Sequence, residues 1–135
     1  MGFDALLETE CPPGRFLLCC GQGRILLTRT RRIIAAHPEC NPVWIRANDP
    51  FEQMREVLRV LGITARQLSP FSRCLRCNLP IETIGREEAR ADVPDYVWQT
   101  QSGFSRCPRC LRTYWAGTHT ARGRERIKML FDGMP

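Results

Sequence analysis

Two Cys-x-x-Cys pairs constrain the fold of this chain more than any other feature of its sequence. The pairs are Cys74 with Cys77 and Cys107 with Cys110. Each pair places two thiols on one tight turn, and two such pairs are the usual framework of a structural zinc site. Four thiolates complete a closed tetrahedron that leaves no open position for catalysis, so we predict a structural Zn²⁺ at these residues. The alternative is reduced cysteines that meet by chance or form a redox pair.

The other four cysteines do not share this pair spacing: Cys11, Cys19, Cys20 and Cys40. We interpret them as small buried hydrophobic residues. A second metal site built from Cys11, Cys40 and His37 is the alternative. Because the chain begins without the basic and long apolar segments of a secretion signal, we expect a reducing compartment, the cytoplasm, in which the thiols stay reduced.

Length and charge bound the remaining possibilities. With 135 residues, the chain fits one ordinary domain or a small domain followed by a metal-stapled module, and we favour the second. No apolar run approaches the length that crosses a bilayer, so we expect no membrane partner. The net charge of +6 comes almost wholly from arginine, since Lys128 is the only lysine. Arginine binds phosphate in a bidentate way, which favours an RNA or DNA partner; the alternative is an ordinary solvated surface.

The first half is predicted to alternate between strands and helices. Residues 24–28 form a short apolar run after a glycine-rich break, which is typical of a buried strand in a parallel sheet. Residues 43–46 form a second such run. Between them, residues 30–39 are mixed basic and apolar, and could hold a short crossover helix that ends before Pro38. This order predicts an α/β fold.

A well-marked helix follows. Asp49 is its predicted N-cap, Pro50 its first residue and Glu52 the partner in a capping box. The helix should run to about Leu61, with Gly62 as its stop. Apolar residues recur on one face at helical spacing and are predicted to form core: Phe51, Met54, Val57, Leu58 and Leu61.

The second half is predicted to be a zinc ribbon with a helical tail. Residues 81–91 could include a short charged helix, which Pro94 would end. Residues 96–98 and 113–115 are rich in aromatic and β-branched side chains and are predicted as short strands. Residues 121–131 are predicted to form a basic helix.

We place the domain boundary between the two halves, giving an α/β domain over residues 1–69 and a zinc ribbon with a basic C-terminal helix over residues 70–135. Asn78, directly after the first cysteine pair, tolerates the left-handed turn that a zinc knuckle requires. In so small a module the aromatic residues are expected to form a mini-core and not to stack on bases: Trp98, Phe104 and Trp115.

Arginines flank both cysteine pairs: Arg73, Arg76, Arg106 and Arg109. They could offset the charge of a tetrathiolate zinc centre, or they could form a rim that binds phosphate, and both interpretations stay open. Five arginines are our candidate nucleic-acid contacts: Arg31, Arg32, Arg106, Arg109 and Arg112.

Several segments together resemble one known family. They are residues 2–5, residues 23–29 (Gly-Arg-Ile-Leu-Leu-Thr-Arg), the helix over residues 49–62, residues 70–78, Val93-Pro94 and residues 107–119. The Pro-Phe-Ser-Arg-Cys motif that opens the first cysteine pair and the Tyr-Trp-x-Gly-x-His motif after the second pair are specific. On these residues, the chain resembles the Mut-seven C-terminal RNase family over nearly its whole length.

The resemblance implies a PIN-like nuclease domain followed by a zinc ribbon. Active relatives gather carboxylates at the carboxyl ends of parallel strands, bind divalent metal there and hydrolyse RNA. The chemistry is consistent, because Mg²⁺ or Mn²⁺ prefers anionic oxygens, activates water and stabilises the leaving oxygen.

This chain departs from the family pattern in two places. Relatives carry aspartate directly after the Leu-Thr-Arg strand end, where this chain has Thr30, whose neutral hydroxyl lacks the charge of a carboxylate. Relatives also begin with a strand and a helix that would precede Met1, so we expect a partial, N-terminally incomplete PIN-like sheet. Glu8 and Glu10 lie near the acidic helix start of relatives and are expected to be surface acids.

We therefore expect a zinc-binding, RNA-associated, PIN-like protein with impaired or lost nuclease activity, and we assign no catalytic residue. An active divalent-metal-dependent ribonuclease, whose ribbon helps to hold RNA, is one alternative. A fragment whose zinc ribbon is purely structural is another. Zn²⁺ is the expected cofactor, with Mg²⁺ or Mn²⁺ only if the nuclease site functions.

Overall fold

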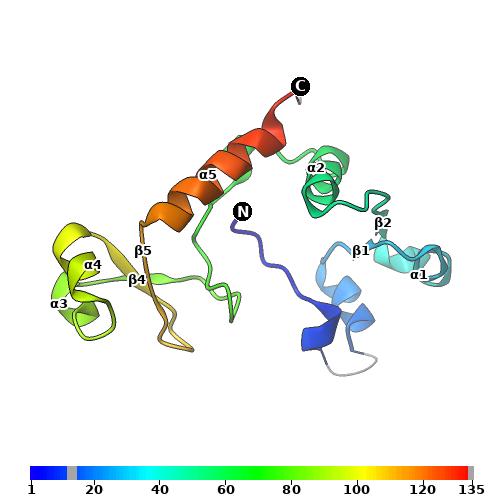
Figure 1. Ribbon diagram of the computed structural model, residues 1–135. Coiled ribbons are helices and arrows are strands. Elements are labelled where there is room, and N and C mark those ends of the chain that lie inside the picture. The colour runs from blue at the N-terminus through cyan, green and yellow to red at the C-terminus, as the bar shows by residue number, and fades with distance from the viewer. Residues whose placement is uncertain (12–14, 134–135) are drawn as a thin grey trace. The chain divides into compact units, whose positions relative to one another are not determined.

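The computed structural model describes residues 1–11 and 15–133, except for the side chains of Glu10 and Cys19. The predicted mixed α/β class is confirmed, with a short parallel strand pair, helices and a separate antiparallel sheet (Figure 1). In chain order the elements are η1 (Glu8–Glu10), η2 (Leu17–Gln22), β1 (Leu27–Thr28), α1 (Arg31–Ala36), η3 (Pro38–Cys40), β2 (Val43–Trp44), α2 (Pro50–Val60), η4 (Ala65–Gln67), β3 (Glu82–Ile84), α3 (Arg86–Ala89), α4 (Asp95–Thr100), β4 (Phe104–Arg106), β5 (Thr113–Trp115) and α5 (Thr118–Phe131), where η marks a 3₁₀-helix.

The chain divides into two compact units, neither of which is continuous in sequence. We call Met1–Ala5 with Gln67–Met129 the cysteine unit, and Leu6–Arg66 with Leu130–Pro135 the parallel-strand unit. The first residues of the chain therefore belong with the cysteine pairs. The separate domains over residues 1–69 and 70–135 stay a prediction.

In the parallel-strand unit, β1 and β2 lie side by side and run in the same direction, with Leu27 opposite Val43 and Thr28 opposite Trp44. The amide of Val43 donates to the carbonyl of Leu26 (2.8 Å). Helix α1 connects the two strands, as a parallel pair requires. The predicted strand, crossover helix and parallel strand are therefore confirmed.

The apolar run before α1 is not buried on both faces, contrary to the prediction. Leu26 is 5% exposed, whereas Ile25 and Leu27 on either side are 51% and 45% exposed. This alternation has the period of two that a strand covered on one face shows. The continuous apolar run misled the prediction because the described part of the chain leaves the other face of this strand uncovered.

Helix α2 begins at Pro50, as predicted, but the carboxylate of Glu52, predicted to complete a capping box, accepts from the guanidinium of Arg55 (3.5 Å). The carboxylate of Asp49 accepts hydrogen bonds from the amides of Phe51 (2.9 Å) and Glu52 (3.0 Å), which confirms it as the N-cap. Gly62 follows the helix with a φ of 63°, a left-handed value that glycine adopts at little cost. The predicted core face is buried unevenly, since Leu58 is 1% exposed and Met54 is 40% exposed.

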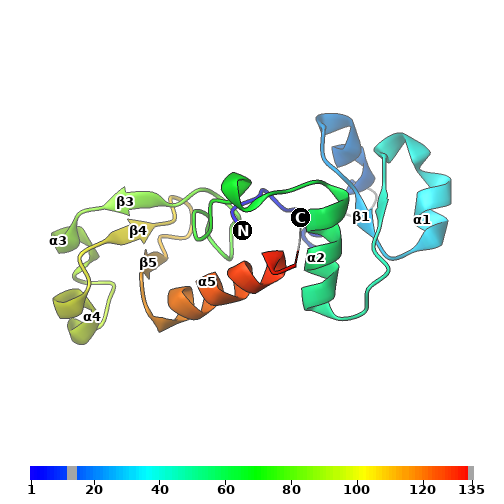
Figure 2. The same cartoon turned by 90° about the horizontal axis from the view of Figure 1, so that it is seen from above.

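The cysteine unit is built on the antiparallel sheet β3-β4-β5, with α3 and α4 at one end of it (Figure 2). Its core consists of four buried residues, Ala89, Val93, Val97 and Phe104. Three further residues pack against them: Ile84, Trp98 and Trp115. The predicted aromatic mini-core is confirmed.

The predicted strand over residues 96–98 is wrong, because these residues lie in α4. The carbonyl of Pro94 accepts hydrogen bonds from the amides of Val97 (2.9 Å) and Trp98 (3.0 Å), which starts a helix at this point. The helix places Val97 in the core at 2% exposure. Proline before a helix is a start signal, and here it outweighs the strand preference of the Tyr-Val-Trp sequence. Strands β3 and β4 were not predicted at all.

Hydrogen bonds attach the first residues of the chain to the cysteine unit. The guanidinium of Arg73 donates to the carbonyl of Gly2 (3.1 Å), and the side-chain amide of Asn78 donates to the carboxylate of Asp4 (2.6 Å). Gly2 has a φ of 92°, and a β-carbon there would lie 2.2 Å from the carbonyl oxygen of Ser69. A side chain at this position would therefore be strained, which favours glycine.

Helix α5 confirms the predicted helix over residues 121–131 and begins slightly earlier. Its sequence carries arginines and the single lysine on several sides. None of the helices in the described ranges combines the length and the apolar character needed to cross a membrane.

Candidate metal centre

Two loops with the same backbone hydrogen bonds carry the four cysteines. In one loop the amide of Asn78 donates to the carbonyl of Cys74 (2.9 Å), and in the other the amide of Leu111 donates to the carbonyl of Cys107 (3.0 Å). In both, the amide of the first cysteine donates to the carbonyl five residues ahead (2.8 and 3.0 Å). Asn78 and Leu111 have left-handed φ values of 54° and 58°. The predicted left-handed turn at Asn78 is confirmed, and the two loops are equivalent knuckles.

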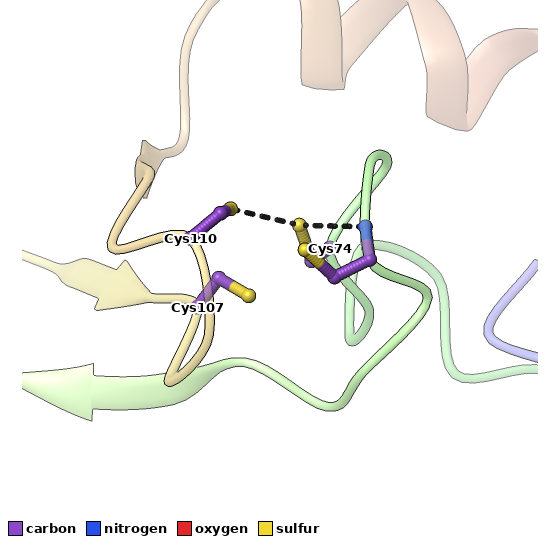
Figure 3. Close-up of side chains that lie close together, drawn as sticks. Cys74, Cys107 and Cys110 are labelled. Atoms are coloured by element: carbon purple, nitrogen blue, oxygen red, sulfur yellow. Dashed lines mark hydrogen bonds between the residues drawn. The ribbon is translucent and has the colours of Figure 1, made fainter.

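The structure brings the four predicted cysteines together. Their sulfur atoms all lie within 4.8 Å of one another, and the thiols are free. In Figure 3, the side chains of Cys74, Cys107 and Cys110 turn toward a common centre. Cys74 and Cys107 are buried, at 2% and 0% exposure, while Cys77 and Cys110 are half-buried.

This arrangement fits a metal ion held by four thiolates. A tetrahedral zinc with bonds of about 2.3 Å places its sulfur ligands about 3.8 Å apart. The Sγ atoms of Cys74 and Cys110 are 3.6 Å apart, far longer than a disulfide bond. Thiolate is a soft ligand that suits zinc and does not suit magnesium or calcium. Since protein sulfurs occupy all four positions, a bound zinc would be structural.

Hydrogen bonds to sulfur orient the first cysteine. The hydroxyl of Tyr114 in β5 donates to Cys74 Sγ (3.1 Å) and accepts from the amide of Leu75 (3.2 Å). The amide of Cys77 also donates to Cys74 Sγ (3.3 Å). Donors of this kind fix the position of a metal ligand and stabilise its anionic form.

The thiols differ in how readily they ionise. Burial raises the pKa of Cys74, but hydrogen bonds from the Tyr114 hydroxyl and from backbone amides outweigh it and lower this pKa to about 6. Burial and the neighbouring thiols raise the pKa of Cys77 to about 12. Burial and the bond to Cys74 raise the pKa of Tyr114 to about 12, so its hydroxyl keeps the proton that it donates. A bound cation would favour the thiolate form of Cys77, because metal ligation displaces the thiol proton.

Comparison with known protein families gives a match over most of the chain. The family model that matches the chain is the Mut7-C RNAse domain, over residues 1–127. This chain belongs to that family. The resemblance found in the sequence is confirmed, and both cysteine pairs lie within the matched residues. No curated protein and no solved structure matches the chain.

The structure gives the arginines near the cysteines different surroundings. Arg106, a predicted nucleic-acid contact, is paired with the carboxylates of Glu88 and Asp92, and its side chain is 18% exposed. Arg73 donates to backbone carbonyls, including that of Asn78 (2.5 Å). These two arginines therefore hold the fold together.

The other four candidate nucleic-acid contacts are exposed: Arg31, Arg32, Arg109 and Arg112. They are divided between the two units, and the structure does not gather the five candidates into one patch within either unit. Arg109 lies within the second cysteine pair, and Arg112 follows the second knuckle. Their contact with nucleic acid stays a prediction.

The remaining cysteines do not form a second metal site in the described part of the chain. The four-cysteine cluster is the one group of potential ligands found there. Cys40 is buried, as predicted, whereas Cys11 and Cys20 are only half-buried. The pKa of Cys40 is raised to about 11 by a hydrogen bond with Cys20 and by burial. His37 instead contacts the carboxylate of Glu39 through Nδ1 (3.0 Å). The predicted burial of Cys19 lies outside the described side chains, as does the surface position of Glu10.

Sequence reasoning missed the role of Tyr114. It was predicted as part of a strand, which is correct, but not as a hydrogen-bond donor to a metal ligand. Its place four residues after the second cysteine pair was a usable signal. A strand leaving the second knuckle runs back past the first, so an inward tyrosine there can reach a sulfur of the opposite pair.

Proposed function

We propose that this protein is a zinc-stabilised, RNA-binding member of the Mut7-C RNAse family in which nuclease activity is impaired or lost. The observation that carries the proposal is the convergence of four free sulfurs within 4.8 Å on two equivalent knuckles. Zinc is the metal that such a donor set favours, and its role would be to hold the cysteine unit together. We place the protein in the cytoplasm, where thiols stay reduced.

The RNA part of the proposal rests on family membership and on charge. A net charge of +6 carried by arginine gives the chain a means of binding a phosphate backbone without base recognition. Arg106 is held in ion pairs, so the candidates for this contact are the four other predicted arginines, which are exposed: Arg31, Arg32, Arg109 and Arg112. Candidate phosphate contacts would then lie in both units, and the metal centre in the cysteine unit.

The hydrogen bonds made by the acidic residues after β2 favour weak or absent nuclease activity. Asp49 caps α2, and the carboxylate of Glu56 accepts the amides of Arg46 (2.9 and 3.1 Å) and Ala47 (3.0 Å). Both carboxylates therefore already accept hydrogen bonds from backbone amides. At the end of β1, where relatives carry an aspartate, the neutral Thr30 donates its amide to Thr28 Oγ1 (3.1 Å). Divalent cations that assist RNA hydrolysis are bound by anionic oxygens, which a nuclease of this kind would need at such strand ends.

The test uses the full chain purified with its zinc. Binding to a labelled single-stranded RNA is followed by fluorescence anisotropy at increasing salt, and cleavage of the same RNA is followed on a gel with and without Mn²⁺. We expect affinity that falls steeply with salt and no cleavage in either condition. Absence of binding at low salt would overturn the RNA proposal and leave a purely structural zinc ribbon.

An active ribonuclease is the second candidate, favoured by family membership. Cleavage that appears with Mn²⁺, and is absent without it, would establish this function. Thr30→Asp supplies the carboxylate that relatives have, and Thr30→Asn is a control of the same shape without the charge. If weak cleavage exists, Thr30→Asp should increase it and Thr30→Asn should not.

A further inference from the structure

One tryptophan in the parallel-strand unit holds two arginines. The guanidinium carbons of Arg31 and Arg46 lie 4.3 Å and 4.6 Å from the ring centroid of Trp44. Trp44 is the last residue of β2, Arg46 follows the strand, and Arg31 is the first residue of α1 after β1. The carboxyl ends of two parallel strands therefore bring these three side chains together. We call them the Trp44 cluster.

The positive charges of the Trp44 cluster are not neutralised within the described residues. Neither guanidinium there forms an ion pair with a carboxylate, and both arginines are exposed. The contact of Arg46 with Glu56 is made through the backbone: the Glu56 carboxylate accepts hydrogen bonds from the amides of Arg46 and Ala47. Two like charges thus share one ring, whose π-face attracts each of them by about 0.5–1 kcal/mol at an exposed site.

A second tryptophan, Trp98, also holds two arginines, but these have hydrogen-bond or ion-pair partners. The guanidinium carbons of Arg86 and Arg90 lie 4.3 Å and 4.6 Å from the ring of Trp98, the same distances as in the Trp44 cluster. There, however, Arg86 donates to the carbonyl of Trp98 (2.8 Å), and the indole of Trp98 donates to the carbonyl of Arg86 (3.3 Å). Arg90 is paired with the carboxylate of Asp95. That group is satisfied internally and has a structural role.

We propose that the Trp44 cluster binds the phosphate backbone of single-stranded RNA. This inference rests on the proposed function and names the residues that would carry it. Two guanidiniums held by a ring present their donors without the full entropic cost of ordering free arginine side chains, and each can contact phosphate in a bidentate way. Ligands of open α/β sheets commonly bind beyond the carboxyl ends of the strands, where this cluster lies.

The exposure of the cluster favours a polymer over a small anion. Arg31 and Arg46 stand on the surface, with the exposed Arg32 beside Arg31 in the sequence. An exposed pair of cations binds a single phosphate weakly in water, since solvent screens the attraction. A polyanion gains from several contacts at once, because each one releases condensed counterions.

The test compares the unchanged chain with two double variants of equal charge. Arg31→Gln with Arg46→Gln removes the cations of the cluster. Arg59→Gln with Arg66→Gln is the matched control, because it removes two exposed arginines of the same unit that lie outside the cluster. Affinity for a labelled single-stranded RNA oligonucleotide is measured by fluorescence anisotropy over a series of salt concentrations, and circular dichroism checks that each variant is folded.

We expect the cluster variant to lose at least tenfold in affinity at low salt. Its slope of log affinity against log salt should become shallower by about 1.4, from two phosphate contacts at about 0.7 each. The control should change both quantities much less. Equal behaviour of the two variants would overturn the inference while leaving RNA binding intact, whereas failure of the unchanged chain to bind RNA would overturn the proposed function itself.

Three further measurements separate the contribution of the cluster from that of net charge. Arg31→Lys with Arg46→Lys keeps the charge but loses the planar fork, so affinity should be only partly restored. In NMR titrations with the RNA, the indole signal of Trp44 should shift and that of Trp98 should not. Inorganic phosphate, added at the same concentration of phosphate groups as the RNA, should not displace it; displacement would overturn the assignment to a polymer backbone.

Discussion

Several arginines of the cysteine unit are held by hydrogen bonds and ion pairs, whereas two arginines of the parallel-strand unit rest on a tryptophan ring. In the cysteine unit, Arg73 and Arg106 are tied to backbone carbonyls and carboxylates, and the Trp98 ring carries arginines that are themselves bonded within the unit. In the parallel-strand unit, Arg31 and Arg46 rest on Trp44 without a carboxylate partner among the residues described. Net charge and the number of arginines therefore do not show where a polyanion would bind.

The units also differ in what holds them together. The cysteine unit has a small core around Phe104, and four buried or half-buried thiols converge beside its sheet. The parallel-strand unit relies on a two-stranded pair and the capped helix α2. Because a small core supplies little stability, the first unit is expected to depend on a metal and the second is not.

The largest expected effect comes from removing one metal ligand. Cys107→Ser should abolish zinc binding and unfold the cysteine unit, because structural zinc contributes about 10–16 kcal/mol in small zinc modules. Zinc content and NMR dispersion check this. Cys20→Ser, in the other unit, is the control and should leave the zinc content unchanged. A folded cysteine unit in the zinc-free Cys107→Ser variant would break the comparison.

A smaller effect is expected from Arg106→Gln. The change leaves the carboxylates of Glu88 and Asp92 without their partner and should lower the free energy of unfolding by about 2 kcal/mol, after allowance for their partial exposure. Urea unfolding measures this value. Arg109→Gln, which is exposed, should change stability little. If both variants lost RNA affinity equally and neither lost stability, Arg106 would be a nucleic-acid contact and not a structural one.

Tyr114→Phe tests the hydrogen bond to the metal ligand. Losing the donor to Cys74 Sγ should weaken zinc binding by about tenfold, measured by competition with a chromogenic chelator. Tyr96→Phe is the control, because Tyr96 is 68% exposed and should retain the zinc affinity of the unchanged chain. Identical affinities in both variants would mean that the Tyr114 hydroxyl serves the fold alone.

The smallest effect is expected from Gly2→Ala. The new β-carbon would meet Ser69 at a left-handed φ of 92°, which should destabilise the cysteine unit by about 1–2 kcal/mol. Gly103→Ala has no neighbour within 4 Å of its added carbon and should be nearly neutral. Equal thermal stability of the two variants would show that the first residues of the chain do not contribute to this unit.

Strong local signals allowed several elements to be predicted from the sequence. The N-cap at Asp49 and the left-handed turn at Asn78 are set by side chains that act within a few residues, so both were recognised. The cysteine cluster was also predicted, because metal-ligand spacing carries information about distant contacts. The strand predicted at residues 96–98 failed since the preference of three residues was outweighed by Pro94 and by the core position of Val97.

Other features depend on contacts that the sequence does not display. The pairing of β4 with β3 joins segments that α3 and α4 separate in the chain, and neither segment was predicted as a strand, whereas β5 was. The roles of Arg106 and Tyr114 likewise depend on partners 14 to 40 residues away. For arginine in particular, the sequence shows that a charge exists but not whether a carboxylate already holds it.

The central claim is that four cysteines hold a single zinc ion on which the cysteine unit depends. Native mass spectrometry of the purified chain, before and after a strong chelator, tests it most directly when combined with NMR spectra of the same samples. We expect one zinc per chain, and its removal should collapse the dispersed signals of Val97 and Phe104. A zinc-free chain that keeps those signals, or a mass showing disulfides between the cysteine pairs, would contradict the account.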